Sequence, residues 1–82
     1  MKAKFRLSKL AINEDGTPSG EVLFFIEGCL FSDIVVGSSV CVFKTNKNGN
    51  EEYGYFYTSL VMEMTKDGFM TMNSLYKVEK IN

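Results

Sequence analysis

The sequence predicts an all-β fold, a single domain over residues 1–82 in which five or six antiparallel strands close into a small barrel. Apolar and polar residues alternate over short segments, as they do in half-buried strands. Clusters of Gly, Asn, Asp and Ser separate these segments, and apolar residues do not recur at the spacing of an amphipathic helix. Since so few strands cannot form two broad sheets, closure into a barrel is the economical way to protect the strand edges.

The first predicted strand covers residues 2–12. Phe5 and Leu7 share one parity of this segment, whereas the apolar residues that follow fall on the opposite parity. A bulge or bend near Ser8 and Lys9 would bring all of them to one side of the sheet, and we therefore expect an irregularity there.

The middle of the chain predicts a loop and two further strands. Residues 13–20 are rich in turn formers and hold the only proline, which predicts a loop of about eight residues. Residues 21–31 are apolar on both parities, so this strand is buried on both faces or leaves one face for a partner. A turn at Gly37 precedes a β-branched strand over residues 40–43. The Asn-Gly pair at residues 48–49 is a strong hairpin signal, because both residue types accept positive φ.

The C-terminal half predicts three more strands. Residues 53–64 form a long strand, and the Asp-Gly pair at residues 67–68 predicts a second tight hairpin turn. This turn leads into a short strand over residues 69–72. A turn-like break at residues 73–76 separates it from the last strand, residues 77–81.

This order of elements resembles the SH3-like barrel. The matching features are a long first hairpin, a second strand that follows a glycine, two tight hairpins, and residues 73–81 in the place of the final turn and strand. The chain has no Trp, and it lacks the acidic and aromatic loop motifs with which SH3 domains bind proline-rich peptides. The resemblance therefore implies the architecture alone, because a fold carries no function by itself.

Residues 58–78 contain a second pattern, "TSxV", then a short turn with Gly, then "TxNSxY". This pattern resembles the C-terminal half of small, mostly uncharacterised proteins of bacteriophages and other mobile elements. The positions that carry it are Thr58, Ser59, Val61, Gly68, Thr71, Asn73, Ser74 and Tyr76. The resemblance implies a phage-encoded protein, and inhibition of a host protein is one function that it suggests.

Composition excludes several functional classes. Nine basic and ten acidic residues give a net charge of -1, so the whole protein does not attract a polyanion. The absence of histidine removes the commonest general base and metal ligand, and we expect neither an enzyme nor a cofactor. No segment has the length of a membrane span or the pattern of a secretory leader, which predicts a soluble, cytoplasmic protein.

The cysteines and acidic pairs give no metal site. Cys29 and Cys41 lie in apolar strand segments, and we expect two reduced thiols in the core rather than a disulfide. They are too few for a structural zinc site. The acidic pairs at residues 14–15 and 51–52 lie in predicted turns, where solvated carboxylates are normal.

Three tyrosines, Tyr53, Tyr55 and Tyr57, share one face of the long predicted strand. The opposite face carries apolar residues without charge and is the better candidate for the core. Its members are Phe56, Thr58, Leu60, Met62 and Met64. The tyrosines then point outward, where they either cover the sheet by cross-strand packing or form a binding or oligomer surface.

Two further groups have alternative interpretations. Four methionines on the two strands beside the Asp-Gly turn should be cross-strand neighbours, and core filling is favoured over an adaptable contact surface. They are Met62, Met64, Met70 and Met72. Four basic residues of the first strand could contact the phosphates of a nucleic acid, or they could simply form its solvated face. They are Lys2, Lys4, Arg6 and Lys9.

The sequence therefore predicts a non-catalytic protein-interaction module that binds a partner protein or self-associates, with homodimerisation as the first mechanism. The physical reason is the apolar content of residues 21–31 and 53–64, which exceeds what one small interior can bury. Two alternatives stay open: a nucleic-acid-binding barrel, and a receptor for a small ligand or nucleotide with a pocket at a barrel mouth or subunit junction.

Overall fold

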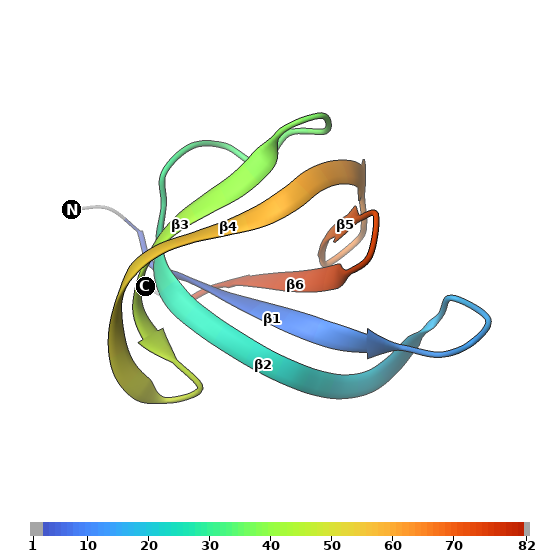
Figure 1. Cartoon of the computed structure of the whole chain (residues 1–82), viewed down its shortest axis with the longest axis horizontal. Coiled ribbons are helices and arrows are strands. Elements are labelled where there is room, and N and C mark those ends of the chain that lie inside the picture. The colour runs from blue at the N-terminus through green and yellow to red at the C-terminus, as the bar shows by residue number, and fades with distance from the viewer. Residues whose placement is uncertain (1–2, 82) are drawn as a thin grey trace.

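The computed structural model describes residues 3–81 and contains six strands (Figure 1). They are β1 (Phe5–Ile12), β2 (Pro18–Leu30), β3 (Ser39–Lys47), β4 (Asn50–Met64), β5 (Gly68–Thr71) and β6 (Leu75–Lys80). Each strand pairs antiparallel with the next, and β6 pairs with β1, which closes the barrel. The predicted all-β barrel is confirmed. Among residues 3–81 no helix is long and apolar enough to cross a membrane.

The predicted hairpins lie where the turn residues placed them. Asn48 and Gly49 have φ angles of 53° and 86°, as a two-residue hairpin between β3 and β4 requires. The amide of Thr65 donates to the carbonyl of Gly68 at the turn between β4 and β5. The first loop is shorter than predicted, because β2 already begins at Pro18.

The expected irregularity in the first strand lies on its partner instead. β1 pairs with β6 without a break from Phe5 to Leu10. Against β2, however, Lys9 lies opposite Phe24 and Leu10 opposite Val22, so the extra residue is in β2. The expected irregularity thus lies next to Lys9, but the continuous β1–β6 ladder shows that the extra residue belongs to β2 and not to β1.

The core is built from inward positions of all six strands. The buried apolar residues that form one core cluster are Leu7, Ile26, Val40, Val42, Val61, Phe69 and Tyr76. Ring contacts connect Phe24 to Phe56, Phe56 to Tyr76 and Tyr76 to Phe69, with centroids 6.1, 6.5 and 5.0 Å apart. We call these four residues the inner aromatic chain. It connects β2, β4, β6 and β5 through contacts between rings.

Gly28 is required where β2 and β3 approach each other closely. A Cβ atom at Gly28 would lie 2.1 Å from the carbonyl oxygen of Phe43. No side chain fits there, because the clash is with the backbone of β3 rather than with a movable side-chain end. Gly28 therefore lets β2 bend against β3 at the position where the barrel curves.

The C-terminal part of β4 reverses the parity expected from the sequence. Tyr57 lies opposite Cys41 but Leu60 lies opposite Ser39, so β4 has one residue more than β3 over this interval. This extra residue turns Val61 into the core and Leu60 out of it. The prediction that Leu60 and Met62 face the core was wrong, whereas Thr58 is buried as expected and Phe56 packs against the core. A second register shift after Val61 places Met64 opposite the buried Phe69, so Met64 is on the predicted face but is 49% exposed.

The methionines do not fill the core as predicted. Met62, Met64 and Met72 are 54%, 49% and 75% exposed, and Met70 is half-buried. The β4 bulge explains the outward position of Met62, and Met72 lies in the turn between β5 and β6. Core space near them is taken by Phe69, which is completely buried.

Candidate functional site

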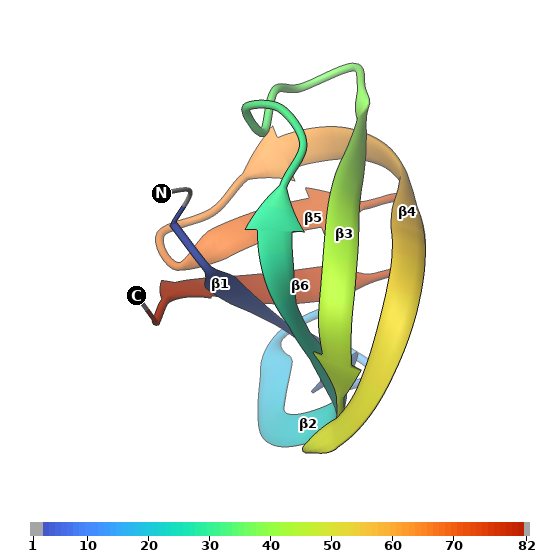
Figure 2. The same cartoon turned by 90° about the vertical axis from the view of Figure 1, so that its left-hand side faces the viewer.

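Strands β2, β3 and β4 lie side by side and form one wall of the barrel (Figure 2). In an antiparallel sheet, residues directly opposite each other project from the same face. On this wall Phe43 lies opposite both Cys29 of β2 and Tyr55 of β4, and Cys41 lies opposite Tyr57. Their neighbours in β3, Val40 and Val42, are buried in the core, so this set projects outward.

Four aromatic rings meet on the outer face of this wall. Tyr55 lies at the centre, with its ring centroid 5.8 Å from that of Phe31, 5.3 Å from Phe43 and 6.3 Å from Tyr57. The contacts with Phe31 and Phe43 are edge-to-face, the arrangement that ring quadrupoles favour. We call Phe31, Phe43, Tyr55 and Tyr57 the outer aromatic surface.

The outer aromatic surface is open to solvent. Phe31, Phe43, Tyr55 and Tyr57 are 62%, 38%, 55% and 66% exposed. The tyrosine stripe expected from the sequence thus faces outward, but the two phenylalanines that complete the cluster were not expected there. The alternation of β4 explains the arrangement, because Tyr55 and Tyr57 point outward on either side of the inward-pointing Phe56.

Tyr53 lies apart from this cluster. It is 62% exposed, and a bulge near Gly54 separates it from Tyr55, since Lys44 lies opposite Gly54 but Asn46 lies opposite Glu51. A hydrogen bond with the Glu51 side chain raises the pKa of the Tyr53 hydroxyl. Tyr53 therefore belongs to the polar end of the wall rather than to the aromatic cluster.

The two cysteines are free and half-buried on the outer face. Their predicted place in the core was wrong, because the alternation of β2 and β3 points their neighbours inward and the thiols outward. The Tyr57 hydroxyl lies beside the Cys41 thiol, and a hydrogen bond between them raises the pKa of Tyr57. The cysteines thus lie at the base of the outer aromatic surface.

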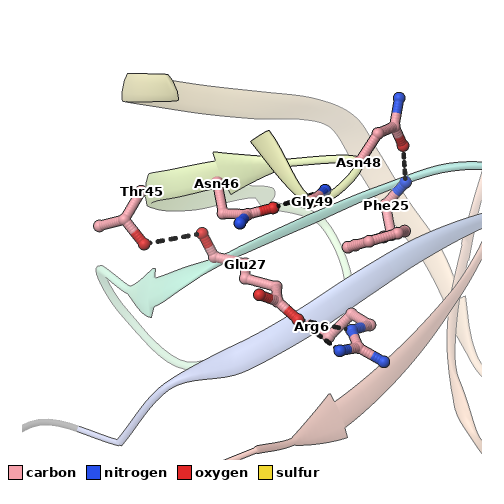
Figure 3. Close-up of polar contacts among 7 residues, drawn as sticks. All are labelled: Arg6, Phe25, Glu27, Thr45, Asn46, Asn48 and Gly49. Carbon is pink, nitrogen blue, oxygen red and sulfur yellow. Dashed lines mark hydrogen bonds and ion pairs between the residues drawn. The ribbon is translucent and has the colours of Figure 1, made fainter. Parts of the chain in front are cut away.

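A polar network fixes the β3–β4 hairpin to β2 (Figure 3). The Asn48 side-chain Oδ1 accepts from the amide of Phe25 at 2.9 Å, and the Asn48 amide donates to the Phe25 carbonyl at 2.9 Å. Asn46 Oδ1 accepts from the amide of Gly49, which closes the turn. The hairpin is therefore held at its tip, and the outer aromatic surface lies on a constrained wall.

The basic residues expected to contact nucleic acid do not form one free face. Arg6 donates to the Glu27 carboxylate at 2.7 Å and lies over the Phe25 ring (Figure 3). Lys4 is exposed, whereas Lys9 is half-buried beside the Phe24 ring of the inner aromatic chain. Lys2 lies outside the described residues. The structure thus separates these cations between the outside and the inside of the barrel.

The grooves and the acidic residues were also considered as places for a ligand or a metal ion. The most apolar groove, about 430 Å³, lies between the first loop and the β4–β5 turn, and Leu10, Pro18, Met70 and Leu75 are among its lining residues. Charged and polar residues of the β4–β5 turn, Thr65, Lys66 and Asp67, also line it, and Tyr76 is its single aromatic residue. Within residues 3–81, no three Cys, Asp or Glu side chains gather as a metal site.

Comparisons of the chain with protein-family models, with curated proteins and with solved structures find no match. The resemblance of residues 58–78 to phage proteins therefore stays a prediction. Among the described residues, the outer aromatic surface is the largest exposed group of connected rings.

Proposed function

We propose that the protein is a non-catalytic protein-interaction module that binds a partner protein or a second copy of itself through the outer aromatic surface. The observation that carries this proposal is the set of four rings in contact on a constrained sheet face, each at least 38% exposed. Tyrosine and phenylalanine are enriched at interfaces, because they bury much area at a small cost in conformational entropy.

The exposed ring area fits an interface of moderate size. At about 200 Å² per ring, the exposed fractions of the four rings correspond to about 440 Å². A standard interface buries about 800 Å² per partner, so the rings would supply roughly half of it. Exposed Leu60, Val35 and Val36, from the bulge of β4 and the β2–β3 loop, are available for the remainder.

Homodimerisation is the first mechanism that we propose. A two-fold symmetric interface places a surface against its own copy, so an uncharged patch avoids like-charge repulsion. The nearest charge along the outer face of β2 is Glu27, which is already paired with Arg6. If the phage resemblance of residues 58–78 holds, the same surface is the one that we expect to contact a host protein.

Light scattering after size exclusion, over a range of protein concentrations, tests the proposal. The wild-type chain should shift from monomer to dimer with concentration, and the double variant Tyr55→Ala, Tyr57→Ala should stay monomeric. Met72→Ala is the matched control, because it removes a 75% exposed apolar side chain from the β5–β6 turn. Equal dimerisation by the double variant and the wild type would contradict self-association through this surface.

Capture of proteins from the source cell extends the test to a different partner. The wild type and Met72→Ala should retain the same protein, and the double tyrosine variant should lose it while its melting temperature stays within a few degrees of wild type. If neither dimerisation nor capture depends on the two tyrosines, the outer aromatic surface is not an interaction site.

A further inference from the structure

Three lysines point toward the inside of the barrel near the β3–β4 hairpin. Lys9 lies opposite Phe24, Lys47 lies opposite Ile26, and Lys44 lies opposite Gly28. Since Ile26 is completely buried and Phe24 packs on the core, these register positions face inward. The three lysines are half-buried, whereas the other four lysines of residues 3–81 are exposed. The exposed ones are Lys4, Lys66, Lys77 and Lys80.

The three side chains converge on one aromatic ring and one carboxylate. Lys9 Nζ lies 5.8 Å from the centroid of the Phe24 ring, and Lys47 Nζ lies 5.3 Å from the same centroid. Lys44 Nζ forms an ion pair with Glu52. The hydrogen bond from Lys44 lowers the pKa of Glu52, and the charges of Lys44 and Lys47 lower it further. Two of the three ammonium groups, those of Lys44 and Lys47, therefore act on one carboxylate, and Lys9 joins Lys47 at the Phe24 ring.

This arrangement leaves a local excess of two positive charges in a protein whose net charge is -1. All three residues are half-buried, and a positively charged group in such a place is stabilised by a nearby anion. The Phe24 ring compensates only in part, since a cation–π contact at a partly exposed site contributes about 0.5–1 kcal/mol. An anionic group placed among the three lysines would complete the charge balance.

We propose that this end of the barrel, the basic cluster of Lys9, Lys44 and Lys47, binds the phosphate group of a small ligand. A phosphate monoester carries about -1.5 to -2 charges at neutral pH, which matches the local excess. Lysine is a common phosphate ligand as a point charge with three donors. The edge-to-face pair of Phe24 and Phe56, 6.1 Å apart, lies beside the cluster and offers an apolar contact for the rest of such a ligand.

This site is independent of the proposed protein interaction. The basic cluster lies on inward positions of β1 and β3, and the outer aromatic surface lies on outward positions of β2, β3 and β4. A ligand of the basic cluster would contact the hairpin whose tip Asn48 anchors to Phe25. Loss of one activity should therefore leave the other unchanged.

An NMR titration of isotope-labelled protein at low ionic strength tests the site with three probes: inorganic phosphate, adenosine monophosphate and a short oligothymidylate. Saturable shifts of the amides of Lys9, Lys44 and Lys47 are expected with at least one probe. Saturation by inorganic phosphate alone identifies a free anion, and tighter binding of adenosine monophosphate identifies a nucleotide. Saturation only by the oligonucleotide would overturn the proposal of a small ligand and identify a nucleic-acid site instead. The absence of saturable shifts with all three probes would overturn the proposal.

Charge variants distinguish a specific phosphate site from non-specific electrostatic attraction. Lys47→Gln and Lys9→Gln, on different strands, should each weaken binding about fivefold. Glu52→Gln should tighten it, because the competing carboxylate is removed. Lys66→Gln makes the same change in net charge at an exposed position and should leave the affinity unchanged. Equal weakening by Lys66→Gln and Lys47→Gln, or no tightening by Glu52→Gln, would show that the lysine stems only cover Phe24.

Discussion

The two aromatic clusters of this protein lie on opposite sides of the same strand. Phe56 of β4 belongs to the inner aromatic chain, and its neighbours Tyr55 and Tyr57 belong to the outer aromatic surface. Ring geometry does not distinguish the clusters, since centroid separations are 5.0–6.5 Å inside and 5.3–6.3 Å outside. Solvent exposure does, because Phe69 is completely buried and Tyr57 is 66% exposed.

This difference shows how a short chain distributes its apolar residues. A six-stranded barrel has one interior, and the seven buried core residues with the rings of Phe24 and Phe56 fill it. Further rings must then lie outside, where they add little to folding unless another molecule covers them. The inner aromatic chain should therefore control stability, and the outer aromatic surface should control association.

The largest expected effect comes from breaking the inner aromatic chain. Phe69→Ala removes a completely buried ring that stacks on Tyr76 and should lower the free energy of unfolding by about 3–5 kcal/mol. Chemical denaturation measures this change, and for a domain of this size the variant can be unfolded at room temperature. Phe69→Leu, which keeps most of the volume, should retain a cooperative transition. Wild-type stability of Phe69→Ala would contradict the position of Phe69 in the core.

The next largest effect is expected from the β3–β4 hairpin, which Asn48 fixes to β2. Asn48→Ala removes the acceptor for the Phe25 amide and places alanine at a φ of 53°, so a loss of about 2 kcal/mol is expected. Asn48→Gly keeps the favourable turn conformation and loses only the acceptor, which predicts a loss of about 1 kcal/mol. Denaturation of both variants measures the two contributions. Equal stabilities of the two variants would show that backbone strain at this position is negligible.

The fold could be predicted from the sequence because turn residues mark the strand ends. Asn48 and Gly49 locate a hairpin whatever the rest of the chain does. The positions of bulges could not, since a single extra residue in β2 or β4 reverses the parity of everything beyond it and has no fixed sequence signal. Leu60 and Met62 were assigned to the wrong face for this reason.

The outer aromatic surface could be predicted only in part, because bulges also determine which residues meet there. The parity of β4 predicts the outward tyrosines correctly, because the bulges lie on either side of Tyr55 and Tyr57. Phe43 was missed since a regular two-residue hairpin at residues 48–49 would place it opposite Gly54, and only the bulge near Gly54 moves it opposite Tyr55. Phe31 follows the end of β2, where no pattern predicts which way its ring points.

A smaller effect on folding is expected from the outer aromatic surface. Tyr55→Ala removes a ring that is 55% exposed, so the free energy of unfolding of the monomer should fall by less than about 1 kcal/mol. Denaturation at a concentration where the protein is monomeric measures this loss. Its ratio to the loss caused by Phe69→Ala compares how much the outer and the inner rings contribute to folding. A loss as large as that of Phe69→Ala would mean that the outer rings support the barrel itself.

The smallest effect at neutral pH is expected from titration of the inner tyrosine. Burial raises the pKa of Tyr76 above its ordinary value of 10.0, although a hydrogen bond with Ser74 opposes this shift. The folded protein thus holds the phenolic proton more tightly than the unfolded chain does. This contribution to stability is complete below pH 10 and is lost as the pH rises through the raised pKa. Melting temperatures of wild type should therefore fall above pH 10, and Tyr76→Phe should fall less steeply.

Tyr57→Phe is the matched control from the outer aromatic surface, where a hydrogen bond with Cys41 is the largest cause of the raised pKa and burial is a smaller one. A phenolate at this exposed position stays solvated, so its formation should disturb the fold less than a phenolate formed at Tyr76. The alkaline slope of the melting temperature should accordingly change more in Tyr76→Phe than in Tyr57→Phe. If both variants reduce the fall of the melting temperature above pH 10 equally, the burial of Tyr76 does not make its response to pH different from that of Tyr57.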